Sequence, residues 1–279
     1  VNSYIEENRY ITERPLLLDS LQEANMVKQL EWNALEENKY YLYDFMSNNC
    51  CTKPRDLLEQ LGVTWNHKLL SGTYRSYVDT YVHNEWMDFG IDLLLGSRVD
   101  EDLDNRTAMF LPDELDENVR VATIQSSPLN STIVLLLQNQ VQQSPWSPKP
   151  AMCFWLLLCI VLLLQVTGKY KGLLQFFSMI YLLLLGVLGC VLLYMWCCTD
   201  HPYVRDNFNI LWAFPLHLPM AFYISFSKNK KIINLYLRIA MIALIVAVIL
   251  WILQIQNYHS SVIPLMLLAA WSIRRHRLL

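Results

Sequence analysis

The stretch LLQFFSMIYLLLLGVLGCVLLYMWC, residues 173–197, contains no charged side chain. A helix needs about 20 apolar residues to cross a bilayer, so this segment places the chain among membrane proteins. Four further apolar runs lie in the same half of the chain, and Pro215, His217 and Pro219 interrupt one of them. We therefore expect a mainly α-helical membrane protein with five transmembrane helices, at about 151–166, 173–197, 209–226, 232–254 and 261–273.

Charge is distributed unevenly between the two halves of the chain. Residues 1–150 contain 12 Lys+Arg and 23 Asp+Glu, whereas residues 151–279 contain 10 and 2. Eight of the basic residues lie in alternate loops or at the C-terminal end: Lys169, Lys171, Lys228, Lys230, Lys231, Arg274, Arg275 and Arg277. The other loops contain only Arg205, so the positive-inside rule predicts a cytoplasmic C-terminus and an extracytoplasmic acidic half. The acidic half also has no basic patch for a nucleic acid.

Two adjacent cysteines occur in that outer half, within DFMSNNCCTKPRDLLEQLG, residues 44–62. Pro54 suits the first turn of a helix and Gly62 suits a helix end, so Cys50 and Cys51 fall at a helix N-terminus. The N–H groups and the positive dipole end at such a place stabilise a thiolate, which is how a cysteine nucleophile is commonly activated. A disulfide or a small buried hydrophobic residue accounts for the same pattern.

Other catalytic templates are absent from the sequence. There is no glycine-rich phosphate loop, no GxSxG and no HExxH. The CC pairs at 50–51 and 197–198 lack the CxxC spacing that is typical of zinc sites. We therefore expect neither a metal nor another cofactor, and cysteine chemistry remains.

Several blocks of the sequence resemble the Lnb-type lipoprotein N-acyltransferases. YYLYDFMSNNCCTKPRDLL, TYRSYVDTYVHNEWMDFGIDLLLGSRVD and MFLPDELDENV are similar to successive blocks of that family's periplasmic domain, and TDHPYVRDNFNILWAFPLHL is similar to its external loop and following span. The most specific block combines Tyr-x-Tyr-Asp, Asn-Cys-x-Thr and Arg-Asp, found here at Tyr41, Tyr43, Asp44, Asn49, Cys50, Thr52, Arg55 and Asp56. The resemblance implies that Cys50 is the nucleophile, with these motif residues in support and Cys51 at a variable position.

The resemblance further implies a fold. The outer domain, expected at residues 1–125, is then α-rich and of α+β type, similar to circularly permuted papain-like amidohydrolases. A short strand and a tether at 126–150 join it to the membrane domain at 151–279. No histidine precedes Cys50, and the sequence opens without an initiator Met or an export signal. We therefore expect the outer domain to be N-terminally incomplete, with the catalytic histidine further upstream.

The implied reaction completes lipoprotein maturation in the bacterial inner membrane, with the outer domain in the periplasm. A membrane phospholipid donates an acyl chain to Cys50, and the resulting thioester passes it to the α-amine of a diacylated apolipoprotein. Both substrates lie in the membrane, which accounts for an enzyme fixed there. The resemblance leaves open which phospholipid and which acyl chain are used.

The external loop TDHPYVRDNFN, residues 199–209, carries most of the candidate lipid-binding residues. We expect this loop at the outer interface, where lipid headgroups and the acceptor amine lie, and we expect a phosphate to meet its one basic side chain. The candidates are His201, Arg205, Asn207, Asn209, Trp212 and the intramembrane His217. A simpler reading pairs Arg205 with Asp200 or Asp206.

Two further functions fit the sequence. One is a membrane-anchored cysteine amidase or peptidase of the cell envelope, which lipid products from the purified protein would distinguish from an acyltransferase. The other is a non-catalytic lipid-binding protein in which Cys50 is structural. Thiol labelling at neutral pH separates that case, because a structural disulfide does not react.

Overall fold

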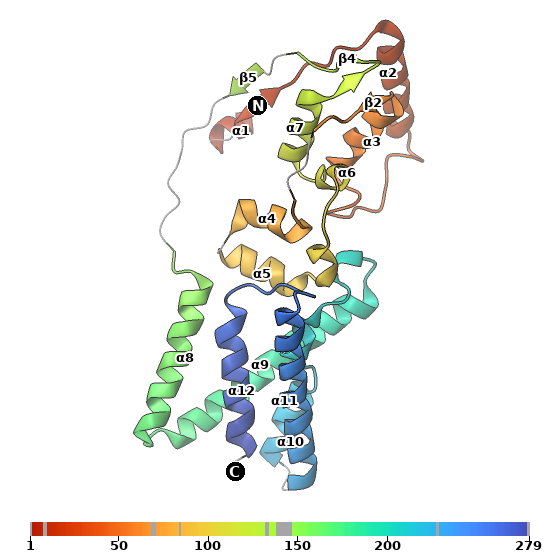
Figure 1. Cartoon of the computed structure of the whole chain (residues 1–279). Coiled ribbons are helices and arrows are strands. Elements are labelled where there is room, and N and C mark those ends of the chain that lie inside the picture. Colours follow the sequence, from red (N-terminus) through yellow and green to blue (C-terminus); the bar gives the residue numbers. More distant parts are fainter. Residues whose placement is uncertain are drawn as a thin grey trace. The chain divides into compact units, whose positions relative to one another are not determined.

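The computed structural model describes residues 2–7, 10–67, 71–83, 85–131, 134–137, 147–226 and 229–277 (Figure 1). They form two compact units: unit 1 comprises residues 1–72 and 102–146, and unit 2 comprises 73–101 and 147–279. The predicted domains, 1–125 and 151–279 joined by a segment at 126–150, follow the expected membrane boundary, whereas the compact units follow contacts. Residues 73–101 consequently join the unit that contains the apolar helices.

Unit 1 is mainly helical with two small antiparallel sheets. Its helices are α1 (Asn2–Glu6), α2 (Ser20–Ala34), α3 (Thr52–Gln60), α6 (Asn105–Ala108) and α7 (Pro112–Val121). Its strands are β1 (Ile11–Glu13), β2 (Val63–Thr64), β3 (Thr123–Ile124), β4 (Ser127–Pro128) and β5 (Val134–Leu137). The sheet orders are β1-β5 and β2-β3-β4. Strand β5 lies within the predicted segment of strand and tether at 126–150, of which residues 138–146 are outside the described residues. The division into domains and the papain-like topology stay predictions.

The hydrophobic core of unit 1 is formed by Leu58, Val63, Val119, Ala122, Ile124 and Leu129, and a further buried stretch leads from α6 to α7. Ala108 and Met109 are fully buried and Phe110 is 1% exposed, so the segment between α6 and α7 is an interior wall. A bidentate ion pair between Arg14 and Asp116, with N–O distances of 2.7 and 2.6 Å, ties the chain beside β1 to α7. The two cysteines therefore sit on a packed scaffold and not on a free loop.

Unit 2 contains the long apolar helices and three short elements ahead of them. The short elements are α4 (Tyr74–Val82), α5 (Trp86–Leu94) and η1 (Ser97–Asp100), and the rest are α8 (Pro150–Thr167), α9 (Lys171–Cys198), η2 (Pro202–Val204), η3 (Phe208–Leu211), α10 (His217–Phe226), α11 (Lys230–Ile252) and α12 (Val262–Arg277). Among the described residues, α8, α9 and α11 are long and apolar enough to cross a membrane. The count of five spans stays a prediction.

The third predicted span, residues 209–226, is not one helix. The chain there forms η3, a turn at 212–216 and the ten-residue α10. Pro215 lies in the turn, where its missing N–H costs nothing, and Pro219 lies in the first turn of α10 for the same reason. The apolar composition was read correctly, but the backbone changes direction at the prolines.

Two glycines allow this broken segment to pack tightly against α9. A Cβ on Gly186 would lie 2.2 Å from the backbone N of Leu218, and one on Gly189 would lie 1.8 Å from the backbone O of Ala213. Backbone-to-backbone contact of this kind requires the smallest residue. The GVLG sequence in α9 therefore seats the turn and the start of α10.

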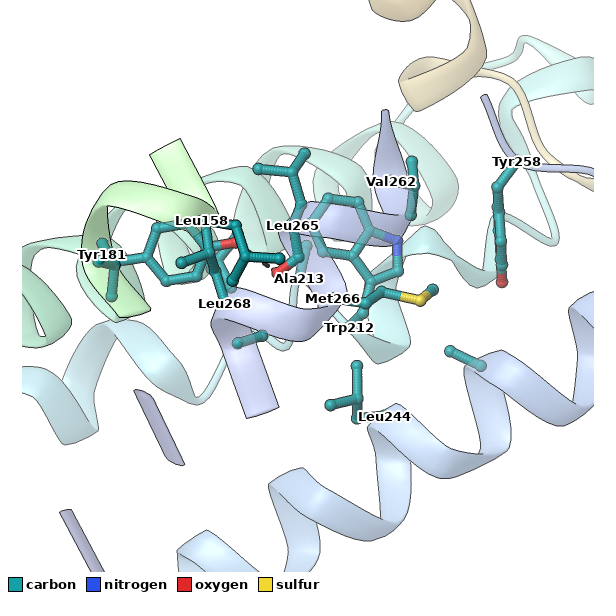
Figure 2. Packing of buried hydrophobic residues seen from close by; sticks show 14 of the residues in the cluster. Leu158, Tyr181, Trp212, Ala213, Leu244, Tyr258, Val262, Leu265, Met266 and Leu268 are labelled. Atoms are coloured by element: carbon teal, nitrogen blue, oxygen red, sulfur yellow. Dashed lines mark hydrogen bonds between the residues drawn. The ribbon is translucent and has the colours of Figure 1, made fainter. Parts of the chain in front are cut away.

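The apolar core of unit 2 surrounds α12 (Figure 2). Leu268 and Ala269 of α12 are fully buried, and Trp212 from the turn is 1% exposed. Figure 2 shows these neighbours with side chains from α8, α9 and α11, among them Leu158 and Leu244. Charged residues lie at the C-terminal end of α12, whereas the other helices cover its middle. Although α12 is only 16 residues long, it therefore lies at the centre of the apolar core.

Candidate functional site

Asn49 organises the start of α3. The Asn49 Oδ1 atom accepts hydrogen bonds from the backbone N–H groups of Cys51 and Thr52, at 2.8 and 2.9 Å. Its own N–H donates to Thr52 Oγ1 at 2.7 Å. The bonds Lys53 N to Asn49 O and Arg55 N to Cys51 O extend the helical pattern back to Asn49. Asn49 therefore acts as a helix cap, and Cys50 is the first residue after it.

The amide donor of Asn49 fixes the same turn to the core. Asn49 Nδ2 donates to Phe45 O at 2.6 Å and to Phe110 O at 2.9 Å, and the residue is 3% exposed. All of its side-chain bonding capacity is thus spent on backbone groups. An asparagine is needed here because the side chain must both accept and donate.

The two cysteines have opposite environments. Cys50 is exposed and Cys51 is buried, and all seven cysteines of the chain are free. Burial, negative charge on Cys50 and a hydrogen bond to Cys50 raise the pKa of the Cys51 thiol to about 12. Cys51 is therefore a protonated donor at neutral pH, and Cys50 is the thiol that a reagent or substrate can reach.

Two polar side chains adjoin this pair. The pKa of Tyr43 is raised by loss of hydration and by negative charge on Cys50, so its hydroxyl stays protonated close to that thiol. The carboxylate of Asp113, in the first turn of α7, acts electrostatically on Cys51. Sequence analysis selected Tyr43 but missed Asp113. The sequence offers little indication that Asp113 belongs to the site, because Pro112 and Asp113 also fit an ordinary helix start.

Arg55 and Asp56 lie in an ion-pair network beyond the first turn of α3. Arg55 is 4% exposed and donates to Asp56 Oδ1 at 2.9 and 2.7 Å and to Arg106 O at 3.0 Å. Arg106 in turn pairs with Asp56 at 2.7 Å and with Glu59 at 3.0 Å. These contacts join α3 to α6, so the Arg-Asp part of the motif holds the scaffold of the thiol.

The external loop of unit 2 is anchored by buried amides. Asn207 Nδ2 donates to Leu93 O at 2.8 Å, and Asn209 Oδ1 accepts from Trp212 Nε1 at 2.8 Å. Gln256 donates to Asn207 Oδ1 at 3.2 Å. Asn207, Asn209 and Trp212 are each 1% exposed. The contacts place these three in the interior, where they hold the loop, and their role towards lipid stays a prediction.

His201 and Arg205 remain closer to the surface of this loop. His201 is exposed and Arg205 is half-buried. Arg205 Nη2 donates to Thr199 O at 3.3 Å, while Arg205 Nε has no hydrogen-bond partner among the described residues. Asp206 pairs with Arg98 at 2.9 Å instead. Among the described residues Arg205 forms an ion pair with neither Asp200 nor Asp206, so the simpler pairing is wrong, and donor capacity remains on the guanidinium.

His217 connects α10 to α11. It is 1% exposed, and its Nδ1 lies 2.6 Å from the hydroxyl of Tyr236. A second hydrogen bond joins the ring to the backbone of Trp212. The imidazole is therefore hydrogen-bonded within the protein. These bonds satisfy an imidazole in an apolar setting, and a lipid-binding role for His217 stays a prediction.

An accessible thiol on a capped helix start, in a chain whose other half contains membrane-crossing helices, defines a membrane protein with a thiol-bearing outer domain. Residues 1–80 match the model of the Lnb N-terminal periplasmic domain, and residues 142–278 match that of the Lnb transmembrane domain. The chain belongs to the Lnb family of lipoprotein N-acyltransferase-like proteins. It is a multi-pass inner-membrane protein with a periplasmic N-terminal domain. No curated protein and no solved structure matches it.

Proposed function

We propose that this lipoprotein-modifying membrane protein transfers an acyl chain from a phospholipid to the α-amine of a diacylglyceryl-cysteine lipoprotein, with Cys50 as the nucleophile. The observation that carries the proposal is the asymmetry of the cysteine pair. Cys50 is exposed at a helix start, whereas the adjacent Cys51 is buried, protonated and hydrogen-bonded to it. Anionic sulfur at Cys50 then faces both a thiol donor and the positive end of the α3 dipole.

The first half-reaction forms a thioester. The Cys50 thiolate attacks the ester carbonyl of the phospholipid, and the carbonyl electrons move to oxygen. When the tetrahedral intermediate collapses, the C–O bond to glycerol breaks and the lysophospholipid alkoxide takes a proton as it leaves. The acyl group remains on sulfur, so one difficult exchange is divided into two easier steps.

The second half-reaction forms the amide. The neutral α-amine of the lipoprotein attacks the thioester carbonyl, the C–S bond breaks, and the Cys50 thiolate is regenerated. The amine loses one proton to a base, and we assign that role to no described residue. His67 is the one histidine of unit 1, and its charge acts on the carboxyl group of Glu114.

The oxyanion of both intermediates needs hydrogen-bond donors, and the cap restricts which are available. The N–H groups of Cys51 and Thr52 are already bonded to Asn49 Oδ1. We therefore assign a donor role to the hydroxyl of Tyr43, which stays protonated beside Cys50. Tyr43→Phe removes this donor and keeps the ring, so it should lower the rate of thioester formation about 100- to 1,000-fold.

A lipid donor is favoured over a cell-wall peptide by the side chains around the thiol. The segment before Cys50 exposes apolar and aromatic groups, with 75% of Tyr40, 74% of Leu42 and 52% of Phe45 accessible. The ammonium of Lys53 lies 4.5 Å from the centroid of Tyr41. Tyrosines with lysines are characteristic of the membrane interface, where an acyl ester is presented.

Reconstitution tests the reaction. The full chain is placed in phospholipid nanodiscs with a diacylated lipopeptide, and N-acylation is followed by mass spectrometry. Cys50→Ser should abolish the triacylated product, while Cys51→Ala should keep most of the activity. Hydrolysis of the phospholipid without transfer would support a phospholipase instead, and full activity of Cys50→Ser would refute the proposed nucleophile.

A further inference from the structure

A buried acidic cluster lies in unit 2, outside the thiol site. Asp79 on α4 and Asp88 and Asp92 on α5 each offer a carboxylate oxygen, and the three oxygens lie within 4.8 Å of one another. Asp88 and Asp92 are four residues apart and so share one face of α5. Asp88 is 2% and Asp92 is 5% exposed, whereas Asp79 is half-buried and leaves one side open to solvent.

The nearby cation is insufficient to neutralise this charge. Arg75, 4% exposed, forms an ion pair with Asp92 and a second pair with Asp100, whose Nε–Oδ1 distance is 2.8 Å. Asp100 also accepts hydrogen bonds from the backbone and side chain of Asn257, at 3.1 and 3.2 Å. One guanidinium thus forms ion pairs with two carboxylates, those of Asp92 and Asp100.

A histidine on the far side of the cluster does not supply the missing charge. His259, between α11 and α12, is 7% exposed, and its Nδ1 accepts a hydrogen bond from the backbone N–H of Ser261 at 3.1 Å. The ring proton is therefore on Nε2, and the imidazole is neutral. Nε2 points at Asp88 Oδ2 from 3.5 Å and has no hydrogen-bond partner among the described residues.

A second buried polar group points to a missing ligand. Tyr258 is 9% exposed, and its hydroxyl also has no hydrogen-bond partner in the part of the chain that the structure describes. It lies within electrostatic range of Arg75 and Asp100. Buried donors without partners beside clustered carboxylates are the surroundings that a bound ion with its waters satisfies.

We propose that Asp79, Asp88 and Asp92 bind a hard divalent cation of the Mg²⁺, Ca²⁺ or Mn²⁺ class. Oxygen ligands that share one such ion lie about 2.0–2.6 Å from it, and hence within about 5 Å of one another, as these oxygens do. An all-carboxylate set selects hard cations over zinc. The Nε2 proton of His259 lies where it can donate to Asp88 Oδ2, 3.5 Å away, once the ion holds that carboxylate, and would then orient it.

The ion has a structural task that is independent of acyl transfer. His259 also contacts Phe89 of α5, with ring centroids 5.5 Å apart. The cation neutralises the face that α4 and α5 present to the loop between α11 and α12. The ion therefore fixes the ends of α11 and α12 that meet in this loop to α5.

The test uses the full chain in an uncharged detergent, with Mn²⁺ as the probe and its free concentration measured by electron paramagnetic resonance. We expect one Mn²⁺ per chain, displaced by Mg²⁺ or Ca²⁺. Asp88→Asn should weaken binding at least tenfold, and the exposed acidic neighbour Glu101→Gln should not change it. Asp79→Asn, at the half-buried position, repeats the test if Asp88→Asn does not fold.

A second measurement uses the unmodified protein. Thermal unfolding after treatment with EDTA should shift to lower temperature and recover as Mn²⁺ is added, because a ligand of the folded state at free concentration c stabilises it by RT ln(1 + c/Kd). No bound Mn²⁺ at millimolar concentration, or equal binding by Asp88→Asn and Glu101→Gln, would overturn the site. In that case the carboxylates share protons in place of a cation. Neither result bears on Cys50.

Discussion

Replacing Asn49 by Ala should loosen the turn that carries the nucleophile. The substitution removes the acceptor of the Cys51 and Thr52 N–H groups, and loss of such a cap costs about 0.5–2 kcal/mol. It also removes the donor to two backbone carbonyls, those of Phe45 and Phe110, at about 0.5–1.5 kcal/mol each. The sum is about 3 kcal/mol, which corresponds to about a 150-fold change in the equilibrium between closed and open states.

Buried Cys51 provides the assay for this loss. In a Cys50→Ser background its thiol reacts only when the start of α3 opens, so the rate of labelling measures the local opening equilibrium. Mass spectrometry of the peptide that contains residue 51 separates it from the other cysteines. Asn49→Ala should raise the rate about 150-fold.

The matched control is the preceding asparagine. Among the described residues, Asn48 makes one side-chain hydrogen bond, from Nδ2 to Leu42 O at 2.7 Å, and it is half-buried. Asn48→Ala should therefore raise the labelling rate by less than about tenfold. Equal effects of the two substitutions, or a change below threefold for Asn49→Ala, would refute the role of Asn49 as the cap that organises the site.

Three further outcomes follow from the contacts described. Gly189→Ala places a methyl group against a backbone oxygen and should destabilise the protein by about 1–3 kcal/mol in thermal unfolding. Gly172→Ala, where no atom lies within 4 Å of the added methyl group, should not destabilise it. Equal unfolding temperatures of the two variants would contradict the packing. Arg205→Ala should slow acyl-enzyme formation in single-turnover kinetics and leave attack of the lipoprotein amine unchanged, and equal slowing of both steps would rule out a headgroup contact. Iodoacetamide near pH 8 should label Cys50 and spare Cys51, whose pKa of about 12 leaves roughly one thiolate in ten thousand, and labelling of both would show that the buried thiol is not protonated.

Long apolar runs are the part of the fold that the sequence predicts well. The runs at 173–197 and 232–254 agree within about two residues with α9 and α11. The agreement is close because the transfer of each segment into the bilayer depends on the residues of that segment alone. The run at 209–226 was predicted as one helix and is broken instead. Its turn packs against Gly186 and Gly189 of α9, a contact between segments that local composition does not encode.

The site shows the same division between local and distant contacts. The cap of Cys50 by Asn49 is local, so the adjacent motif led to it directly. The wall at Phe110 and the charge at Asp113 come from about 60 residues further along the chain, and no periodicity links them to α3. His259 and Asp88 are further apart still, and only the packed structure brings them together.

The central claim is that the acyl group passes through the sulfur of Cys50. The direct measurement incubates the full chain with phospholipid and no acceptor, digests it, and determines the mass of the peptide that contains both cysteines before and after neutral hydroxylamine. We expect one acyl chain on Cys50 that hydroxylamine removes, retained in Cys51→Ala and absent in Cys50→Ala. An acyl group that resists hydroxylamine, or one that persists in Cys50→Ala, would contradict the claim.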